Sequence, residues 1–214
     1  LWMKKKFGIK FLNDVRDFYA DSRVDGKMWD LKNPLYRIVY RYFKRKEAEQ
    51  YAVNDGIICL TFAAEKVIRQ LLELKKEIPL QVIPCSADLE LFNPDAINEP
   101  QRTAVKTKFG IKETDTVIAY LGSVGGLYLT DEMMHFCKIA EDKIPNVKFL
   151  FISPSRHNEI ADAATRFNIS LEKLIVVKAS RKEVPLYLSV ANFSVFFIRP
   201  CFSRKSQSPT KHGE

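Results

Sequence analysis

The chain of 214 residues carries 46% hydrophobic and 12% aromatic residues, a composition that can build a core and argues against disorder. No run approaches the ~18 consecutive apolar residues of a transmembrane helix, and the opening LWMKKKFGIKF lacks the apolar region of a signal peptide. The net charge of +8 is concentrated in residues 1–50, which hold 13 Lys and Arg against 7 Asp and Glu. This basic region indicates either an anionic partner (lipid, nucleic acid or phosphorylated substrate) or an ordinary solvated face.

The cysteines lie far apart in the sequence, and none forms a CxxC pair. They are Cys59, Cys85, Cys137 and Cys201. Cys59 sits inside the apolar run GIICLTF, which is typical of a buried reduced thiol. The spacing therefore favours core cysteines in a reducing compartment over metal ligands or disulfides, and predicts a cytoplasmic protein.

The first half of the chain alternates predicted strands and helices. An apolar stretch that ends in charged residues, FGIKFLNDVRDF, predicts a buried strand, and GIICL and LQVIP predict two more. Residues 35–53 place Leu35, Ile38, Tyr42 and Phe43 at helical spacing among basic residues, which predicts an amphipathic helix. Residues 63–76 predict another helix. This order is typical of an α/β fold.

Residues 92–102, FNPDAINEPQR, predict a linker, and the alternation then starts again. Strands are predicted at 115–121, 147–155, 173–180 and 193–200, with helices at 130–143, 156–167 and 181–191 between them. Thr130 is the expected N-cap of the first of these helices, and Pro185 is expected in the first turn of the last. The strands are almost wholly apolar, which favours a parallel sheet covered on both faces. We therefore expect two units, 1–97 and 98–214.

The last seven residues, SPTKHGE, have the pattern of a helix start. Ser208 is a good N-cap and Pro209 suits the first helical position, so the N–H groups of Thr210 and Lys211 can bind an anion. Glu214 follows on the same face, where its carboxylate can accept hydrogen bonds from a vicinal diol such as ribose. Together these groups indicate a sugar nucleotide. The alternative is an ordinary capped helix with an ion pair.

The loop GSVGG, residues 122–126, follows the first predicted strand of the second unit. Its glycines allow close backbone approach to a ligand, and Ser123 can donate a hydrogen bond. Both this loop and SPTKHGE follow apolar strands at the carboxyl end of the expected sheet, where open α/β folds bind ligands. A tight turn without a ligand is the alternative for the glycine loop.

The string VIPCSADLELFNP is similar to the interdomain hinge of retaining glycosyltransferases of the glycosyltransferase 4 type. YLGSVGG, RKEVPLYLSVANFSVFFIRP and SPTKHGE follow in the order of that family's donor domain, so the resemblance runs from about Phe11 to Glu214. It implies an α/β protein with two Rossmann-like domains (GT-B type), both incomplete here. Residues 1–97 would be the C-terminal part of the acceptor-side domain plus the hinge. Residues 98–214 would be a truncated nucleotide-sugar donor-binding domain.

The resemblance also implies roles for single residues. Glu214 would bind the donor ribose, Lys211 and Thr210 would lie beside the diphosphate, and Gly122 and Ser123 would face the phosphates. Ser208 and Pro209 belong to the same donor loop, residues 176–180 correspond to backbone that meets the base, and Asp14 and Arg16 are candidate acceptor-side contacts. The chain departs from the pattern at Ser206, where many members have a second glutamate, and after the glycine loop, where an arginine and a lysine are missing.

The leading hypothesis is a glycosyltransferase that moves a sugar, with retention, from a nucleotide-diphosphate sugar to a glycan, a lipid-linked acceptor or a polysaccharide precursor. The sequence assigns no catalytic residue, metal or cofactor, and the expected fragment would be inactive alone. A peripheral contact with the anionic inner face of a membrane is expected from the basic region. The alternative is a non-catalytic nucleotide- or phosphate-binding module with a basic membrane-docking arm. Nucleic acid is disfavoured because few aromatic residues interleave the basic stretch.

Overall fold

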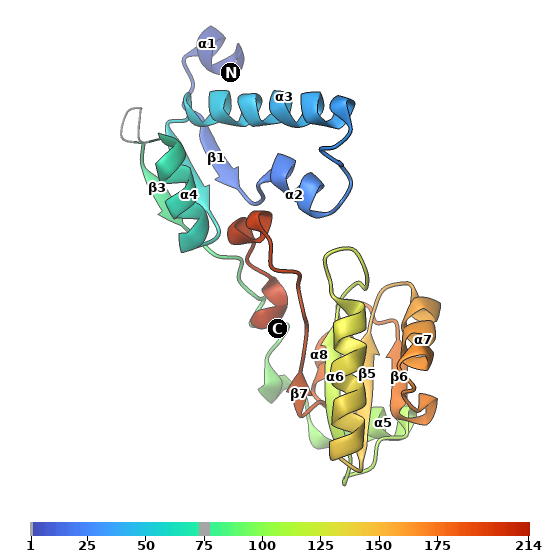
Figure 1. Ribbon diagram of the computed structural model, residues 1–214. Helices are drawn as coiled ribbons and strands as arrows, with labels where there is room; N and C mark the ends of the chain where they lie inside the picture. Colours follow the sequence, from blue (N-terminus) through green and yellow to red (C-terminus); the bar gives the residue numbers. More distant parts are fainter. Residues whose placement is uncertain (1, 73–77) are drawn as a thin grey trace. The chain divides into compact units, whose positions relative to one another are not determined.

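The computed structural model describes residues 2–72 and 78–214, and places them in two compact units (Figure 1). The first unit extends to Ser86 and includes Pro200–His212; the second comprises Ala87–Arg199 with Gly213–Glu214. The unit boundary therefore falls between Ser86 and Ala87, eleven residues before the boundary expected from the sequence, and the chain returns to the first unit near its end. Each unit has its own parallel sheet.

The sheet of the first unit has the strand order β1-β2-β3, with β1 at Leu12–Val15, β2 at Gly56–Cys59 and β3 at Leu80–Val82. All pairs are parallel, and Cys59 of the central strand lies opposite both Val15 and Val82. The helices are α1 (Trp2–Phe7), α2 (Tyr19–Asp25), α3 (Pro34–Tyr51) and α4 (Phe62–Leu72). The predicted first strand is thus an edge strand with an exposed Leu12, not a buried one. The last residues of the predicted second helix lie outside the described residues.

The core of the first unit joins the sheet to its helices. Its buried members are Val15, Phe18, Tyr51, Ile57, Cys59, Ala64 and Ile68. Burial raises the pKa of the Cys59 thiol, which keeps it protonated. All four cysteines are free of disulfides.

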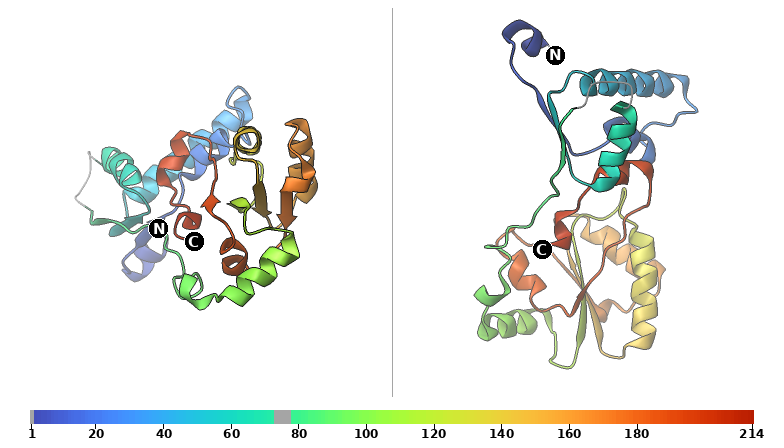
Figure 2. Two further views of the ribbon diagram at one scale, coloured as in Figure 1. Left: turned by 90° about the horizontal axis from the view of Figure 1, so that it is seen from below. Right: turned by 90° about the vertical axis from the view of Figure 1, so that its left-hand side faces the viewer.

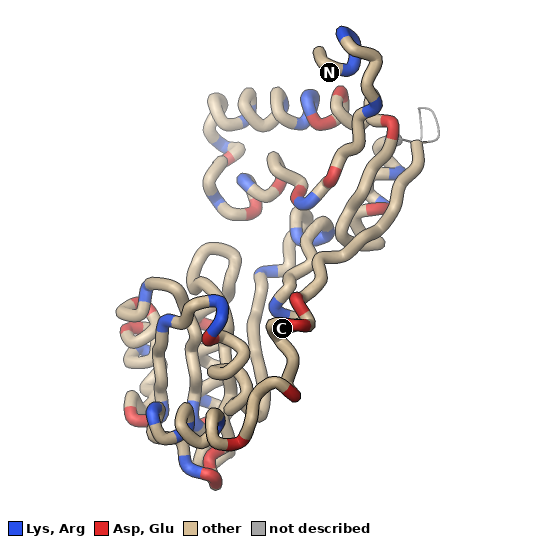
Figure 3. Tube along the Cα trace, turned by 180° about the vertical axis from the view of Figure 1, so that it is seen from behind, with Lys and Arg blue, Asp and Glu red and all other residues tan. Residues whose placement is uncertain are grey.

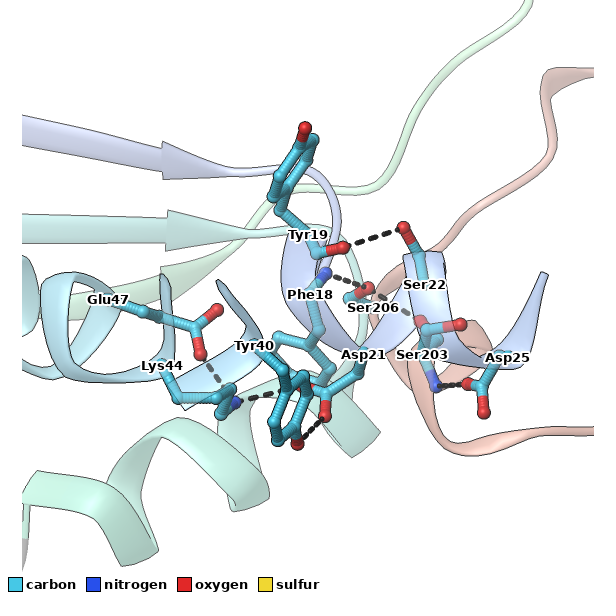
Figure 4. Close-up of polar contacts among 10 residues, drawn as sticks. All are labelled: Phe18, Tyr19, Asp21, Ser22, Asp25, Tyr40, Lys44, Glu47, Ser203 and Ser206. Carbon is cyan, nitrogen blue, oxygen red and sulfur yellow. Dashed lines mark hydrogen bonds and ion pairs between the residues drawn. The ribbon is translucent and has the colours of Figure 1, made fainter. Parts of the chain in front are cut away.

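A short segment from late in the chain packs onto α2. It contains the 3-10 helix η3, Phe202–Ser206, whose Phe202 ring stacks on Phe18 with 5.6 Å between the ring centres. The Ser206 hydroxyl accepts a hydrogen bond from the Phe18 N–H at 3.1 Å, and the Ser203 N–H donates to Asp25 at 2.8 Å (Figure 4). These contacts make residues 202–207 part of the first unit.

A second polar network links α2 to α3. Asp21 accepts hydrogen bonds from the Tyr40 hydroxyl at 2.8 Å and from the Lys44 ammonium at 2.9 Å, and Lys44 also contacts Glu47 (Figure 4). Burial and the hydrogen bond to Asp21 raise the pKa of Tyr40 to about 12. The network holds the middle of α3 against the first turn of α2.

The sheet of the second unit has the strand order β6-β5-β4-β7, again all parallel. The strands are β4 (Thr116–Leu121), β5 (Val147–Ile152), β6 (Leu174–Val177) and β7 (Phe193–Ser194). The helices are α5 (Glu99–Phe109), α6 (Thr130–Lys143), α7 (His157–Arg166) and α8 (Val184–Leu188). Short 3-10 helices lie at Pro94–Ala96 (η1) and Leu171–Lys173 (η2).

Alternate residues of these strands enter two separate cores, which confirms the prediction of a sheet covered on both faces (Figure 2). On one face Tyr120, Phe149 and Phe151 pack against α6 and α7. On the other face Ala119 and Leu150 join the core to which α5 and α8 contribute. This three-layer arrangement is Rossmann-like.

Three local expectations need correction. The predicted strand 193–200 pairs with β4 only at Phe193 and Ser194, because the chain then hydrogen-bonds to residues 127–129. The predicted linker 92–102 instead contains η1 and the start of α5, where Asn98 and Gln101 form a capping box. Thr130 is the first residue of α6 and does not cap it with its side chain. Pro185 lies in the first turn of α8, as predicted.

Candidate functional site

The glycine loop after β4 has a backbone that only glycine adopts easily. Gly122, Gly125 and Gly126 have φ values of 132°, 80° and 65°. A Cβ atom on Gly125 would also lie 3.0 Å from the Arg156 guanidinium. Substitution of these glycines would therefore strain the backbone, which is compatible both with close approach to a ligand and with the alternative of a tight turn.

The rest of the chain holds this loop on both sides. The Tyr120 hydroxyl donates to the Ser123 carbonyl, and the Gly125 N–H donates to the Thr130 hydroxyl at 3.0 Å. Thr130 thus ties the loop to α6, which explains why its hydroxyl does not cap the helix. Beyond the loop, the Arg199 N–H donates to the Leu127 carbonyl at 2.9 Å. The loop is positioned by the sheet and α6 together.

A cavity of about 210 Å³ opens at the carboxyl ends of β4, β5 and β6. Its lining includes Gly122 after β4, Ser153 and Pro154 after β5, and Ala179 after β6. Glu214 also lines it, so two of the predicted donor-site residues, Gly122 and Glu214, meet at one cavity. Parallel strand ends at one edge are where such folds bind ligands.

Arg181 and Phe92 complete the wall around Glu214. Arg181 Nη1 lies 3.5 Å from Glu214 Oε1, and the guanidinium lies over the Phe92 ring, 5.7 Å from its centre. The Glu214 side chain is only 10% exposed, whereas that of Arg181 is 64% exposed. The carboxylate is thus largely buried beside one cation, and its residue lines the cavity.

The other predicted donor-loop residues lie elsewhere. Ser208, Pro209, Thr210 and Lys211 belong to the first unit, where 210–212 form a single 3-10 turn (η4) instead of an α-helix start. A segment of only three helical residues closes with i→i+3 bonds, as the His212 N–H to Pro209 carbonyl bond of 3.3 Å shows. Thr210 is exposed and Lys211 half-buried. Ser123 is exposed on the glycine loop.

A larger cavity of about 510 Å³ is lined by the first turn of α6 and by α7 from Glu159 to Arg166. Its charged lining residues are Asp131, Glu132, Glu159, Asp162, Arg166 and Arg199. One of its two arginines, Arg166, is paired with Asp131 at 2.8 Å. With four acids against two arginines, this cavity disfavours a diphosphate despite its size.

The first unit has its own cavity of about 370 Å³ between the end of β1, the start of α2 and the last turns of α3. Asp14 and Arg16, the predicted acceptor-side contacts, line it and form an ion pair of 2.7 Å with each other. The hydrogen bond from Arg16 to Asp14 raises the pKa of the arginine further. Tyr19 and Phe43 supply aromatic surface to the same cavity.

No sequence pattern singled out Arg181, Phe92 or Ser153 as site residues. Arg181 directly follows the segment 176–180, so the rule that ligands lie beyond strand ends points to it. Phe92 comes from a segment expected to be a linker, and nothing local signals its place in the cavity. Ser153 is buried, with its hydroxyl bonded to the Ser155 carbonyl at 2.9 Å, and it shapes the loop after β5.

Within residues 2–72 and 78–214, no group of three or more His, Cys, Asp or Glu side chains could hold a metal ion. None of the helices in the same parts of the chain combines the length and apolar character needed to cross a membrane.

No protein-family model and no curated protein matches the sequence. Among solved structures, WaaG, described as a glycosyltransferase involved in lipopolysaccharide biosynthesis, matches 78% of this chain and 44% of its own, with 17% identity and a TM-score of 0.59. A glycosyltransferase from Rickettsia africae matches 69% of this chain and 40% of its own, at 12% identity and a TM-score of 0.56. The N-terminal domain of Candida albicans trehalose-6-phosphate phosphatase matches 92% and 47%, at 11% identity and a TM-score of 0.61.

The chain thus spans less than half the length of each of these structures. At such low identities the likeness shows the fold alone. That fold is α/β with Rossmann-like units of the GT-B type, in agreement with the fold class expected from the sequence.

Proposed function

We propose that this chain supplies donor- and acceptor-binding parts of a glycosyltransferase that transfers a sugar, with retention, from a nucleotide-diphosphate sugar to a glycan, lipid-linked or polysaccharide-precursor acceptor. The observation that carries the proposal is the cavity at the ends of β4, β5 and β6, where Gly122 and Glu214 meet. The similarity of the fold to that of two glycosyltransferases supports it.

In this proposal Glu214 accepts hydrogen bonds from the two ribose hydroxyls. Its enclosed carboxylate suits that task, since a diol donates two hydrogen bonds and a carboxylate accepts both. Gly122 allows the backbone to approach the donor closely, and the backbone around Ala179 faces the base. Lys211 and Thr210, which do not line this cavity, are assigned to the diphosphate from the sequence pattern alone.

Catalysis would consist mainly of positioning the donor and stabilising charge. The bond between the anomeric carbon and the diphosphate breaks, so negative charge grows on the leaving oxygen, where a fixed cation and N–H groups lower the barrier most. Binding energy spent on the base and ribose, far from this bond, holds the reacting atoms in place. A cytoplasmic location and a peripheral contact with an anionic membrane belong to the same proposal.

Calorimetry with a panel of nucleoside diphosphates, nucleosides and inorganic phosphate tests the proposal on the full chain. Glu214→Gln should lower the affinity for a ribonucleotide about tenfold to hundredfold, which is the cost of one charge-assisted hydrogen bond. The affinity for its 2′,3′-dideoxy analogue should stay nearly unchanged. Lys211→Ala should weaken binding of the nucleoside diphosphate more than binding of the free nucleoside. Glu159→Gln, in the larger cavity, is the matched control. Equal losses for the ribo and dideoxy ligands, or binding of phosphate as tight as that of nucleotides, would refute it.

A further inference from the structure

The cavity of the first unit has a charge balance that selects its ligand. Its charged lining residues are Asp14, Arg16, Asp17, Lys46 and Glu47, three acids against two bases. Both bases already have acidic partners: Arg16 lies 2.7 Å from Asp14, and Lys46 lies 2.7 Å from Glu49. Asp14 and Glu47 are in turn paired with Arg16 and Lys44, so among the described lining carboxylates only Asp17 has no ion pair, and the lining offers an anionic ligand no unpaired cation.

Aromatic rings form one side of the same cavity. Tyr19 and Phe43, respectively 44% and 36% exposed, line it with their ring centres 5.3 Å apart. Trp29 packs behind them, 5.5 Å from Phe43 and 6.0 Å from Tyr19. Three rings in mutual contact hold each other in position, so the two exposed rings present a preorganised surface to a ligand. The Arg23 guanidinium lies over the Tyr19 ring, 4.7 Å from its centre.

Hydrogen-bonding groups lie on the strand side of the cavity. The Gln50 amide donates to Asn13 Oδ1 at 3.1 Å, which fixes the orientation of both amides. The Gln207 amide donates to Asp17 Oδ1 at 3.2 Å, and the second carboxylate oxygen of Asp17 can accept from a ligand. Asn13, Asp14, Asp17 and Gln50 therefore offer mostly acceptor atoms, which suit a ligand rich in hydroxyl donors.

We propose that this cavity binds an uncharged sugar ring, whose C–H face packs on Tyr19 and Phe43 while its hydroxyls donate to Asp14 and Asp17. A sugar is the common ligand that combines an apolar ring face with many hydroxyl donors and needs no cation. The assignment of this sugar as the acceptor rests on the proposed function. If the sugar is the acceptor, the sugar unit that receives the transferred group carries no phosphate.

Intrinsic fluorescence provides a direct test, because the chain has only two tryptophans, Trp2 and Trp29. In a Trp2→Phe background, emission reports on Trp29 and thus on the aromatic cluster. The protein is titrated with methyl glycosides of common hexoses and N-acetylhexosamines, with short oligosaccharides, with a hexose 6-phosphate, and with vesicles containing anionic phospholipid. We expect a saturable change with at least one neutral sugar and weaker binding of its 6-phosphate.

Two variants separate ring stacking from a general loss of folding. Phe43→Leu should weaken sugar binding about tenfold by removing the flat ring, whereas Phe43→Tyr should retain it. Ile38→Ala, on an exposed position of the same helix and outside the cavity lining, should have no effect. Asp17→Asn should weaken binding of the neutral sugar and should reduce the difference in affinity between that sugar and its 6-phosphate.

No saturable response to any neutral sugar, or a response to the 6-phosphate or to anionic vesicles alone, would overturn the inference. Nucleoside diphosphate binding is measured in the same preparation by calorimetry. Nucleotide binding without sugar binding would reject the sugar site and leave the proposed function standing. Sugar binding without nucleotide binding would reject the proposed function and keep the sugar site.

Discussion

Ser206 occupies the position where the family that the sequence resembles often has a second glutamate, and the structure gives this serine a packing role. It is fully buried, and its hydroxyl bonds to the Phe18 N–H and to the Ser203 carbonyl at 2.7 Å. A carboxylate there would be an uncompensated buried charge. The sequence shows that a glutamate is missing. The sequence cannot show the packing role of Ser206, because its partner Phe18 is 188 residues away.

Arg181 and Arg166 form a matched pair that can decide which cavity of the second unit binds the donor. Both side chains are exposed to a similar degree, 64% and 61%, and each pairs with one acid. Arg181 lines the smaller cavity and Arg166 the larger. Arg181→Gln should weaken binding of a nucleoside diphosphate by only about threefold to fivefold, because solvent screens an exposed charge. It should weaken binding of the nucleoside less.

Calorimetry of the two variants side by side measures this difference, with Arg166→Gln as the control that should bind normally. If Arg166→Gln weakened the nucleotide and Arg181→Gln did not, the donor site would have to be moved to the larger cavity.

Asp25 should make the packing of residues 202–207 dependent on pH. Burial alone would raise the pKa of Asp25, but hydrogen bonds from the backbone and side chain of Ser203 hold it below its ordinary value. A lowered folded-state pKa means that the stabilisation is complete above the unfolded value of about 3.9 and is lost as the pH falls through the folded value. Asp25→Asn should therefore cost about 1 kcal/mol at neutral pH, and this difference should vanish in acid.

Urea unfolding at several pH values measures that difference, which should stay constant above about pH 5. Asp95→Asn, a carboxylate of the second unit outside this contact, is the control. A gap between wild type and Asp25→Asn that persisted at the lowest pH would contradict the assigned hydrogen bond.

At the scale of elements, local sequence patterns predicted the strands and helices that are determined by residues nearby in the chain. The predicted strands at 147–155 and 173–180 and the periodic segment at 130–143 contain β5, β6 and α6. The misjudged segments depend on distant partners. The run 193–200 is apolar enough for a long strand, but hydrogen bonds to residues 127–129 draw it away from β4 after two residues. Thr130 looks like a cap, but its hydroxyl serves the glycine loop.

Helix α3 has an apolar and basic surface that should attract an anionic membrane. Leu35, Ile38 and Tyr42 are exposed, and the helix carries five basic residues against two acidic ones (Figure 3). Each basic residue near an anionic surface contributes about 1 kcal/mol, and salt screens this attraction over ~8 Å at physiological ionic strength. Arg41→Gln with Arg45→Gln should therefore reduce binding to anionic vesicles more than tenfold.

Vesicle sedimentation at increasing salt measures this effect, and binding should weaken as salt rises. Lys106→Gln with Lys108→Gln, on α5 of the second unit, removes the same charge and should change little. Equal binding to neutral and anionic vesicles would exclude an electrostatic contact through α3.

At the scale of the whole molecule, the sequence indicated two α/β units but not how the chain divides between them. Strand-end reasoning located the cavity that Gly122 lines, because apolar parallel strands must end at a common edge. It could not show that residues 200–212 return to the first unit, since contacts such as Phe18 with Phe202 join segments far apart in the sequence. The predicted donor loop is accordingly divided between the units, with Ser208–Lys211 in one and Glu214 in the other.

Separate cores predict that the two units unfold separately, and the tryptophans allow this to be measured. Trp2 and Trp29 both lie in the first unit, so tryptophan emission follows that unit alone, while far-UV circular dichroism follows the helices of both. Leu150 is completely buried in the second unit and Ile57 almost completely in the first. Substitution of either by alanine should cost about 2–5 kcal/mol within its own core.

In urea, Leu150→Ala should lower the midpoint of the second-unit transition seen by circular dichroism by about 1–2 M and leave the tryptophan midpoint unchanged. Ile57→Ala should do the reverse, lowering the tryptophan midpoint by a similar amount. The two substitutions remove apolar side chains of the same size from central strands, so each controls for the other. If Leu150→Ala moved both midpoints together, the units would fold as one cooperative body, and each core would depend on the other for its stability.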